Sequence, residues 1–274
     1  MSRKRLTQVF PFLLPLRKWQ RRNLFYLKMR FDGNRYAKEK PEEKLPYTVF
    51  DTSSLMLNKN SGFDMKYQLN KVHNLELASR TINNVIIKPN ETFSFWQLIR
   101  WADRHEPYKD GLVLIDGKIV DSYGGGLCQL SNMLFWLFLH TPMTVIERHG
   151  HKVKAFPSTT EALPCGTDAT VSEGWLDLKV KNQTNNIFQI IISFDDEYMH
   201  GQILSRNPLD IDYMVYNSSV SYIRRDKKLY QQAYVRRLET NTKTGAKNET
   251  KLYCNQCEIT YELPKDIHIE ERDV

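Results

Sequence analysis

The 274-residue sequence lacks a long apolar run. The segment from Val9 to Leu16 comes nearest to the apolar core of a secretory signal, but it is short, contains two prolines and continues into Arg17-Lys18. No stretch approaches the roughly 20 apolar residues that a membrane-spanning helix needs. We therefore expect a chain that is not cleaved and that works in the cytoplasm.

Motifs of several other protein classes are missing as well. The sequence has no internal repeat, no low-complexity tract and no helix-turn-helix, RNP-like or zinc-finger spacing, so we expect no nucleic-acid partner. Four cysteines do not form a disulfide framework in a chain of this length without a signal peptide. The pair Cys254 and Cys257 has no second pair to complete four zinc ligands, so we expect no metal and no cofactor.

Acidic residues are scarce in the first 44 positions. This segment holds 13 Lys and Arg against 4 Asp and Glu, which leaves 26 against 28 for residues 45–274. The net charge of +7 therefore belongs to the N-terminal segment, and the rest is close to neutral. We divide the chain into a basic, partly aromatic N-terminal arm (1–44), an α+β core domain (45–205) and a β-rich C-terminal extension with a polar tail (206–274).

Basic and aromatic residues are interleaved along this arm. Such a segment is suited to peripheral contact with an anionic membrane surface. The alternative is a solvated basic segment that packs a few aromatic rings on the domain, and we favour this second interpretation.

Three successive glycines, Gly124, Gly125 and Gly126, precede the most apolar segment of the chain. Glycine reaches backbone angles that strain other residues, so the triplet predicts a tight turn. The segment that follows is a helix by its i, i+3, i+7 periodicity, and Thr141-Pro142 ends it. Its apolar stripe consists of Leu127, Leu130, Leu134, Leu137 and Phe138.

Cys128 falls in the first turn of this helix. Free N–H groups and the helix dipole at an N-terminus favour an anion and lower the pKa of a thiol. Cys128, Ser131, Asn132 and Phe135 share a face that differs from the leucine stripe, so we expect the thiol to point away from the core. The alternative is that Cys128 is a small buried apolar residue.

A cysteine nucleophile needs a base within hydrogen-bond reach and a third group that orients the base. Cys128 is followed by His149 and His151 and then by Asp168, which is the order of papain-like and transglutaminase-like sites. We assign Cys128 as nucleophile, His151 as base and Asp168 as orienting group, because His149 precedes a glycine in a bend. A metal site made of Cys128, His149 and His151 is the competing interpretation.

An acyl intermediate also needs an oxyanion contact, which Gln129 or the backbone N–H groups of the glycine turn would supply. A non-catalytic binding module is the other class of function that fits. In that case the turn and the helix N-terminus hold a carboxylate or phosphate of an anionic precursor, or contact a partner protein. The binding residues we assign are Gly124, Gly125, Gly126, Ser131, Arg148 and His149.

The remaining pattern predicts an α+β fold, with an antiparallel sheet on which the cysteine-bearing helix packs, in an element order that is papain/transglutaminase-like. An amphipathic helix is expected over 64–87, and a hairpin over 112–121 with its turn at Asp116-Gly117. A hairpin loop is expected at 182–186, between strands 175–181 and 188–194, and a solvated tail at 262–274. Further strands are expected at 47–50, 143–147, 152–156, from 168, and repeatedly after 203.

These motifs together resemble the VanW family over about residues 70–195. The likeness rests on the strings at 93–95, 124–132, 147–151 and 166–171, and Cys128, Gln129, His151 and Asp168 fall on its recurrent motif residues. It implies a link to glycopeptide (vancomycin-type) resistance clusters and to the bacterial cell wall, without implying one activity.

Together with the thiol chemistry, this resemblance leads us to expect a cysteine-dependent acyl transferase or amidase acting on a cell-wall precursor or another peptide-like substrate. Cys165 stands where the family pattern has another residue type, which raises the alternative of a redox pair between Cys128 and Cys165.

Overall fold

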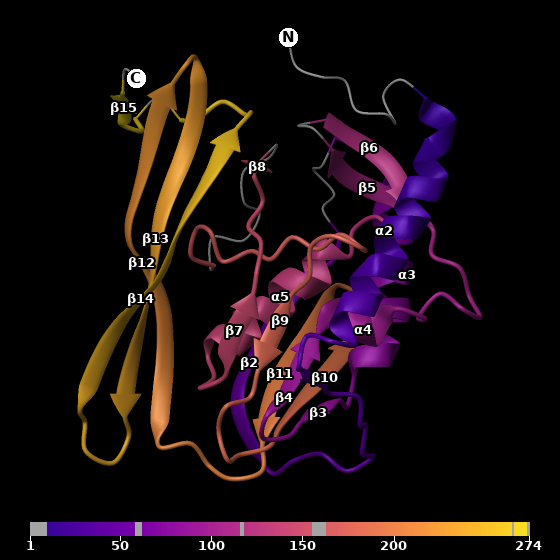
Figure 1. Cartoon of the computed structure of the whole chain (residues 1–274). Helices are drawn as coiled ribbons and strands as arrows, with labels where there is room; N and C mark the ends of the chain where they lie inside the picture. The colour runs from indigo at the N-terminus through magenta and orange to yellow at the C-terminus, as the bar shows by residue number, and fades with distance from the viewer. Residues whose placement is uncertain (1–9, 58–61, 116–117, 155–162, 265, 273–274) are drawn as a thin grey trace.

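A computed structural model describes residues 10–57, 62–115, 118–154, 163–264 and 266–272. These residues form an α+β fold in which three β-sheets and a hairpin surround one central helix, α5 (Cys128–Leu139) (Figure 1). The expected fold class is therefore confirmed at the level of α+β with mostly antiparallel strands.

The first sheet has the order β1 (Arg35–Tyr36), β4 (Glu91–Ser94), β9 (Lys179–Lys181), β7 (Thr144–Glu147). The second has the order β2 (Tyr47–Leu55), β11 (Tyr198–Ser205), β10 (Phe188–Phe194), β3 (Ile86–Ile87). The third has the order β15 (Ile269–Glu271), β12 (Ile211–Arg225), β13 (Lys228–Asn241), β14 (Lys247–Ile259), β8 (Val153–Lys154). Strands β5 (Asp110–Ile115) and β6 (Lys118–Tyr123) form the separate hairpin.

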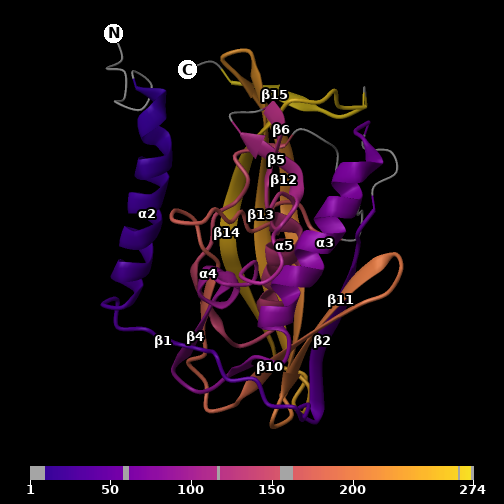
Figure 2. The same cartoon turned by 90° about the vertical axis from the view of Figure 1, so that its right-hand side faces the viewer.

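Three further helices lie around this frame. They are α2 (Leu14–Met29), which follows the short 3-10 turn η1 (Pro11–Leu13), α3 (Met65–Ile82) and α4 (Phe95–Ile99). Figure 2 shows α2 and α3 on opposite sides of the molecule, with α5 between them. Across the part of the chain that the structure describes, no helix combines the length and the apolar character needed to cross a membrane.

Helix α5 is the centre of the core because nine of its twelve residues are apolar, and nine of the twelve are buried. Each sheet contributes to its surroundings. The Phe138 ring lies 4.9 Å from that of Phe93 on β4, and the Phe135 ring lies 6.2 Å from that of Tyr253 on β14. On β11, the glycine Gly201 allows the α5 side chains to approach the sheet closely.

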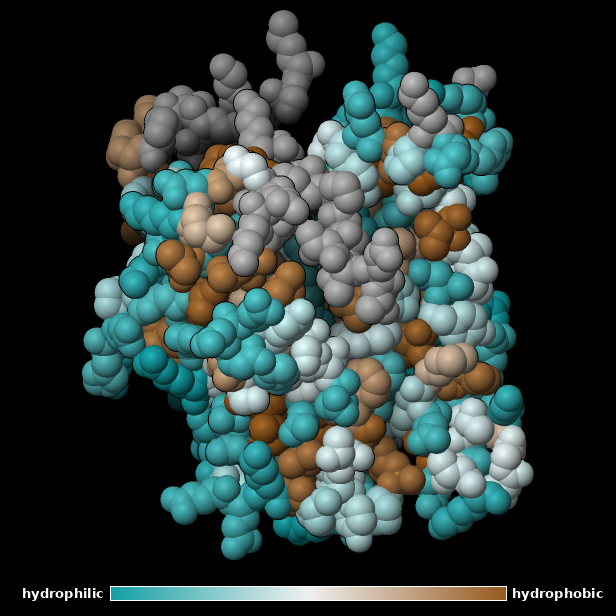
Figure 3. All heavy atoms as spheres, turned by 180° about the vertical axis from the view of Figure 1, so that it is seen from behind, coloured by the Kyte–Doolittle hydropathy of each residue, from teal (hydrophilic) through white to brown (hydrophobic). Residues whose placement is uncertain are grey.

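One expectation about α5 was wrong. Ser131 and Phe135 were expected on a face turned away from the core, yet both are fully buried. The segment around Ala169 covers Ser131, and Tyr253 of the C-terminal extension lies against Phe135. Arg237 on β13 donates to the carbonyl oxygen of Thr141, just beyond the helix end, at 3.0 Å. From behind, the third sheet stands at the right of the molecule, and this face mixes hydrophilic and apolar residues (Figure 3).

Several expected elements are confirmed. The central helix begins at Cys128, the strand at 188–194 is β10, and β5 pairs with β6 as an antiparallel hairpin. The turn of this hairpin, Asp116-Gly117, lies outside the described residues. Residues 155 and 156 of the expected strand at 152–156 lie outside them too.

Other expectations were wrong at their boundaries. The helix expected over 64–87 ends at Ile82, because Asn84 has φ 67° and the chain then enters β3. The segment 182–186 is not a hairpin loop, since β9 belongs to the first sheet and β10 to the second. Residues 168–171 form no strand, and the tail contributes β15, which pairs parallel with β12. The basic arm contains the 16-residue helix α2, and its β1 pairs with β4.

Candidate functional site

The glycine turn that leads into α5 depends on its glycines for two reasons. Gly124 and Gly126 have φ angles of 70° and 95°, which L-residues with a side chain adopt only with strain. Gly125 packs directly against the β5 backbone, because a Cβ atom there would lie 2.1 Å from the carbonyl oxygen of Gly111. The expected tight turn is therefore present, and it brings the chain from β6 to the N-terminus of α5.

Helix α3 holds this turn from one side. The buried Asn74 side chain donates to the carbonyl oxygens of Gly125 at 3.0 Å and Lys109 at 2.8 Å, and accepts from the Lys109 N–H at 2.8 Å. The aliphatic part of Lys71 lies over Gly126, where a Cβ would come within 2.3 Å of it. Burial lowers the pKa of Lys71 to about 8, and no acidic partner contacts its amine among the described residues.

Three predicted residues converge at the start of α5. Cys128 is its first residue, is partly buried, and its Sγ lies 3.8 Å from the carbonyl oxygen of Val171. His151, between β7 and β8, donates from its backbone N–H to Asp168 Oδ2 at 2.6 Å, and its ring Nδ1 lies 2.5 Å from the same oxygen. With Nδ1 engaged by Asp168, Nε2 is the ring nitrogen left for Cys128, and the two side chains interact electrostatically.

The electrostatics of this trio favour a charged histidine. Burial lowers the pKa of the His151 imidazole, but hydrogen bonds and charge interactions with Asp168 and Cys128 outweigh it and raise the pKa to about 10. Burial of Asp168 raises the pKa of its carboxyl group, yet the contacts with His151 and Arg148 hold it below its ordinary value. His151 is therefore an imidazolium at neutral pH, held between a carboxylate and a thiol.

Arg148 fixes the position of Asp168. Its guanidinium group donates to the Asp168 backbone oxygen at 2.6 Å and to Oδ1 at 3.0 Å, and also to the Gly166 oxygen at 2.7 Å. It donates further to Asn255 Oδ1 at 3.1 Å and stacks on the Tyr253 ring at 4.6 Å. Arg148, expected as a binding residue, thus has four acceptors within the protein.

The C-terminal sheet contributes directly to the site. Asn255 on β14 is buried against two glycines: a Cβ atom on Gly150 would lie 2.3 Å from its Oδ1, and one on Gly166 would lie 2.7 Å from its Cβ. The Tyr253 hydroxyl donates to the Gly166 oxygen at 3.1 Å. Sequence reasoning missed both side chains, since alternation along a strand gives no signal of which distant loop it contacts.

The residues after Cys128 attach the Asp168 loop to α5. Ser131 Oγ donates to the carbonyl oxygen of Ala169 at 2.6 Å, and Asn132 Oδ1 accepts from the Ala169 N–H at 2.8 Å. Ser131, expected as a binding residue, is completely buried by this contact. The same motif therefore supplies the thiol and the clamp that holds the carboxylate segment.

Gln129 points in another direction. Its amide nitrogen donates to Ser54 Oγ at 2.9 Å and to the Leu55 oxygen at 2.8 Å, which ties the first turn of α5 to β2. Both amide hydrogens are thereby used. By contrast, the backbone N–H groups of Gly126, Leu127 and Cys128 have no acceptor among the described residues.

The remaining candidate residues lie apart from the hydrogen-bonded trio. The His149 Nε2 lies 3.1 Å from Glu147 Oε1, an atom that also accepts from the Asp177 N–H. Cys165 is a free thiol whose backbone N–H and carbonyl oxygen both bond to Asn217, and it lies within electrostatic range of Cys257.

The pair Cys254 and Cys257 is split by its strand. Cys254 is exposed, whereas Cys257 is buried, where burial raises the pKa of its thiol to about 11. Residues three apart on a strand point to opposite faces, so these two thiols do not converge. No group of three or more side chains suited to metal ligation occurs within the described ranges.

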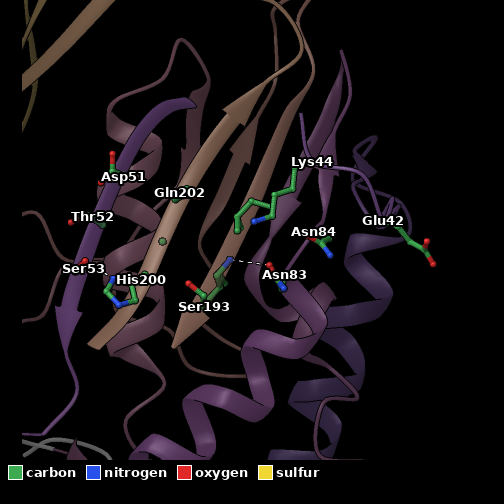
Figure 4. A pocket seen from close by; sticks show the side chains of 13 residues that line it. Glu42, Lys44, Asp51, Thr52, Ser53, Asn83, Asn84, Ser193, His200 and Gln202 are labelled. Atoms are coloured by element: carbon green, nitrogen blue, oxygen red, sulfur yellow. Dashed lines mark hydrogen bonds between the residues drawn. The ribbon is translucent and has the colours of Figure 1, made fainter. Parts of the chain in front are cut away.

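A groove of about 460 Å³ lies elsewhere, on the outer face of the second sheet, and Cys128 does not line it. Lys44 reaches over this face toward Ser193, and Asn83 forms one wall (Figure 4). On its floor, Ser53 Oγ lies 2.7 Å from His200 Nδ1, and His200 Nε2 lies 2.8 Å from Asp195 Oδ2.

Asp195 also accepts the backbone N–H groups of Glu197 and Tyr198. This carboxylate therefore closes the turn between β10 and β11, and the hydrogen bonds through His200 join β2 to that hairpin. All these groups are exposed or half-exposed, and the network stabilises the edge of the sheet.

Comparison with known proteins adds to this geometry. The family model described as VanW like protein matches residues 70–204. The chain is 50% identical over 272 residues to Vancomycin B-type resistance protein VanW of Enterococcus faecalis, covering 99% of both chains. It is 35% identical over 113 residues to Uncharacterized protein YoaR of Bacillus subtilis, which covers 41% of this chain and 36% of that protein. No solved structure matches the chain.

Proposed function

Since the chain belongs to the VanW family, we propose that it serves vancomycin resistance as a cysteine-dependent acyl transferase or amidase on a peptide-like cell-wall precursor. The observation that carries the proposal is the His151 imidazole, which is held by Asp168 and interacts with Cys128 at a helix N-terminus. The element order, with the thiol on a helix before its histidine and carboxylate, is papain-like.

The geometry supports a two-step reaction. The Cys128 sulfur, as a thiolate beside the His151 imidazolium, attacks the carbonyl carbon of the substrate, and the tetrahedral intermediate collapses to a thioester. His151 gives its proton to the departing amine or alcohol. Water or an acceptor amine then attacks the thioester, His151 takes the proton of the attacking group, and the Cys128 sulfur leaves. Asp168 keeps the imidazole oriented throughout and stabilises the imidazolium in the steps where His151 carries the proton.

The oxyanion of these intermediates needs hydrogen-bond donors that are not already used. The Gln129 amide hydrogens are committed to β2, so we assign this contact to the backbone N–H groups of Leu127 and Cys128. One such donor is typically worth about 3 kcal/mol of transition-state stabilisation.

A second function is favoured by Lys71. Its stem lies over Gly126, and its amine has no acidic partner among the described residues. A cation beside free backbone N–H groups suits a carboxylate or phosphate, so a non-catalytic module that holds an anionic precursor is the alternative.

The substitution Cys128→Ser separates the two functions, with Cys254→Ser as the matched control on an exposed thiol. Cell-wall precursor peptides are incubated with each protein, and products and acyl-enzyme are followed by mass spectrometry. We expect turnover and a thioester on Cys128 in the wild type and the control, and neither in Cys128→Ser. Undiminished turnover by Cys128→Ser would contradict the proposal of a cysteine-dependent enzyme. Binding without turnover in all three proteins would establish the module instead.

A further inference from the structure

Helix α2 and the turn η1 before it, which contains Phe12, expose large apolar side chains to solvent. We use the name α2 face for the side chains of Phe12, Leu16, Trp19 and Leu27. They recur at i, i+4, i+7 and i+15, which places them on one side of a helix. Their exposed fractions are 76%, 61%, 59% and 49%, so the α2 face is open along its whole length.

The C-terminal half of α2 is fixed to the body. The Tyr26 hydroxyl donates to Glu173 Oε1 at 2.9 Å, and Tyr26 and Met29 are the two buried residues of the helix. The loop that contains Gly174 approaches the α2 backbone so closely that a Cβ there would lie 3.1 Å from the Arg22 Cα. The helix is therefore docked through its C-terminal half, whereas its N-terminal half is exposed. Figure 2 shows α2 at the left edge of the molecule.

All three exposed tryptophans of the chain gather at α2. Trp19 lies on it, Trp175 stacks under Arg21 of α2 at 4.0 Å, and Trp101 lies 4.7 Å from the Arg100 guanidinium carbon. That same Arg100 covers the Tyr26 ring of α2 at 3.8 Å. Tryptophan prefers the interface between water and lipid, because its ring is apolar and its N–H is polar.

The charge of this region has one sign. Residues 10–31 contain six Lys and Arg and no Asp or Glu. Of these six cations, Arg22 pairs with Glu173 at 3.8 Å. The other five have no ion-pair partner in the described part of the chain. Two copies of such a face would repel one another, whereas anionic lipid headgroups would attract it.

We propose that α2 docks the protein on an anionic lipid surface, lying in the plane of the interface with the α2 face in the headgroup region. An amphipathic helix that combines exposed Trp, Phe and Leu with Lys and Arg binds membranes in this way without crossing them. The docking does not depend on the thiol chemistry, since lipid binding is measured without turnover.

The test is flotation of the full chain with phosphatidylcholine vesicles that contain either no anionic lipid or 30% phosphatidylglycerol. We expect binding to the anionic vesicles alone, weakened by 0.5 M salt and accompanied by a blue shift of tryptophan emission. The double substitution Lys18→Gln, Lys28→Gln should reduce the partition coefficient about 25-fold, roughly fivefold for each lysine.

The substitutions Leu16→Gln and Trp19→Gln together should abolish binding, while Met214→Gln on β12, an equally exposed apolar residue, should leave it unchanged. Circular dichroism confirms that each variant is folded. The proposal is overturned if the wild type ignores anionic vesicles or if the Leu16, Trp19 variant floats as well as the wild type. It is also overturned if the wild type is a dimer that this variant dissociates, with no vesicle binding, because the α2 face would then join two copies.

Discussion

Replacing Asp168 by Asn tests the physical basis of the candidate site. The carboxylate accepts from the His151 backbone and ring on one oxygen and from Arg148 on the other. Asn is nearly isosteric, but it removes the charge and turns an N–H group toward a donor. The substitution therefore changes the electrostatics of the site while the surrounding packing stays in place.

The expected loss of unfolding free energy in Asp168→Asn follows from the burial of the Asp168 carboxylate. Removing one member of a buried ion pair typically costs about 3–5 kcal/mol, because the other charge is left uncompensated. Arg148 retains the oxygens of Gly166, Asp168 and Asn255, so we expect the lower end, about 3 kcal/mol. In a chain of this size that lowers the melting temperature by roughly 6–10 °C.

The difference in unfolding free energy between the wild type and Asp168→Asn should depend on pH, and the two pKa shifts give the direction of that dependence. The pKa of Asp168 is lowered from 3.8, so its contribution is present above that value and is lost as pH falls through the lower native pKa. The pKa of His151 is raised from 6.5 to about 10, so its contribution is complete below 6.5 and is lost as pH rises toward 10. The stability gap between wild type and Asp168→Asn should therefore be widest between these two ordinary values.

Urea unfolding of both proteins from pH 3 to pH 10 measures this difference in stability. Iodoacetamide labelling at pH 7 measures the reaction rate of the Cys128 thiol. We expect slower labelling of Cys128 in Asp168→Asn, since the imidazolium that favours the thiolate loses its main support. A gap below 1 kcal/mol that does not vary with pH, together with unchanged labelling, would refute the reasoning.

Two further substitutions probe the frame of the site. Gly126→Ala should cost about 2–4 kcal/mol in urea unfolding, because it combines a φ of 95° with a close contact to Lys71, whereas Gly245→Ala, at φ 71° with open space around it, should cost about 1 kcal/mol. Equal losses of unfolding free energy in Gly126→Ala and Gly245→Ala would contradict the close contact between Gly126 and Lys71. Asn255→Ala should cost about 1–3 kcal/mol and slow Cys128 labelling, since Arg148 loses one acceptor. Unchanged labelling would show that the C-terminal sheet does not position the site.

Local patterns in the sequence predicted the elements nearest the site. The glycine triplet has the backbone angles that its composition implies, and the periodicity after it locates the start of α5 at Cys128. The order of Cys128, His151 and Asp168 along the chain also anticipated which side chains meet. These features depend on residues close in sequence or on side-chain chemistry, so one amino-acid sequence is enough to predict them.

Longer-range features could not be predicted. Nothing local distinguishes Asn255, which contacts Gly150 and Gly166 from a strand about 100 residues away. The face of α5 expected to be open is covered by the distant segment around Ala169 and by Tyr253 of the same sheet. Strands β9 and β10 pair in different sheets, so the hairpin predicted at 182–186 does not form. Which strands pair with one another depends on the whole fold, whereas the periodicity of a strand indicates only which side chains lie on each of its two faces.

The most direct test of the account compares the reactivity of Cys128 and Cys254 within one molecule. The protein is treated briefly with iodoacetamide at pH 7, and each thiol is quantified by peptide mapping. We predict that Cys128 reacts faster although it is less exposed than Cys254, and that His151→Gln removes this advantage. If Cys128 reacts no faster than Cys254 in the wild type, the thiol is not activated and the central claim fails.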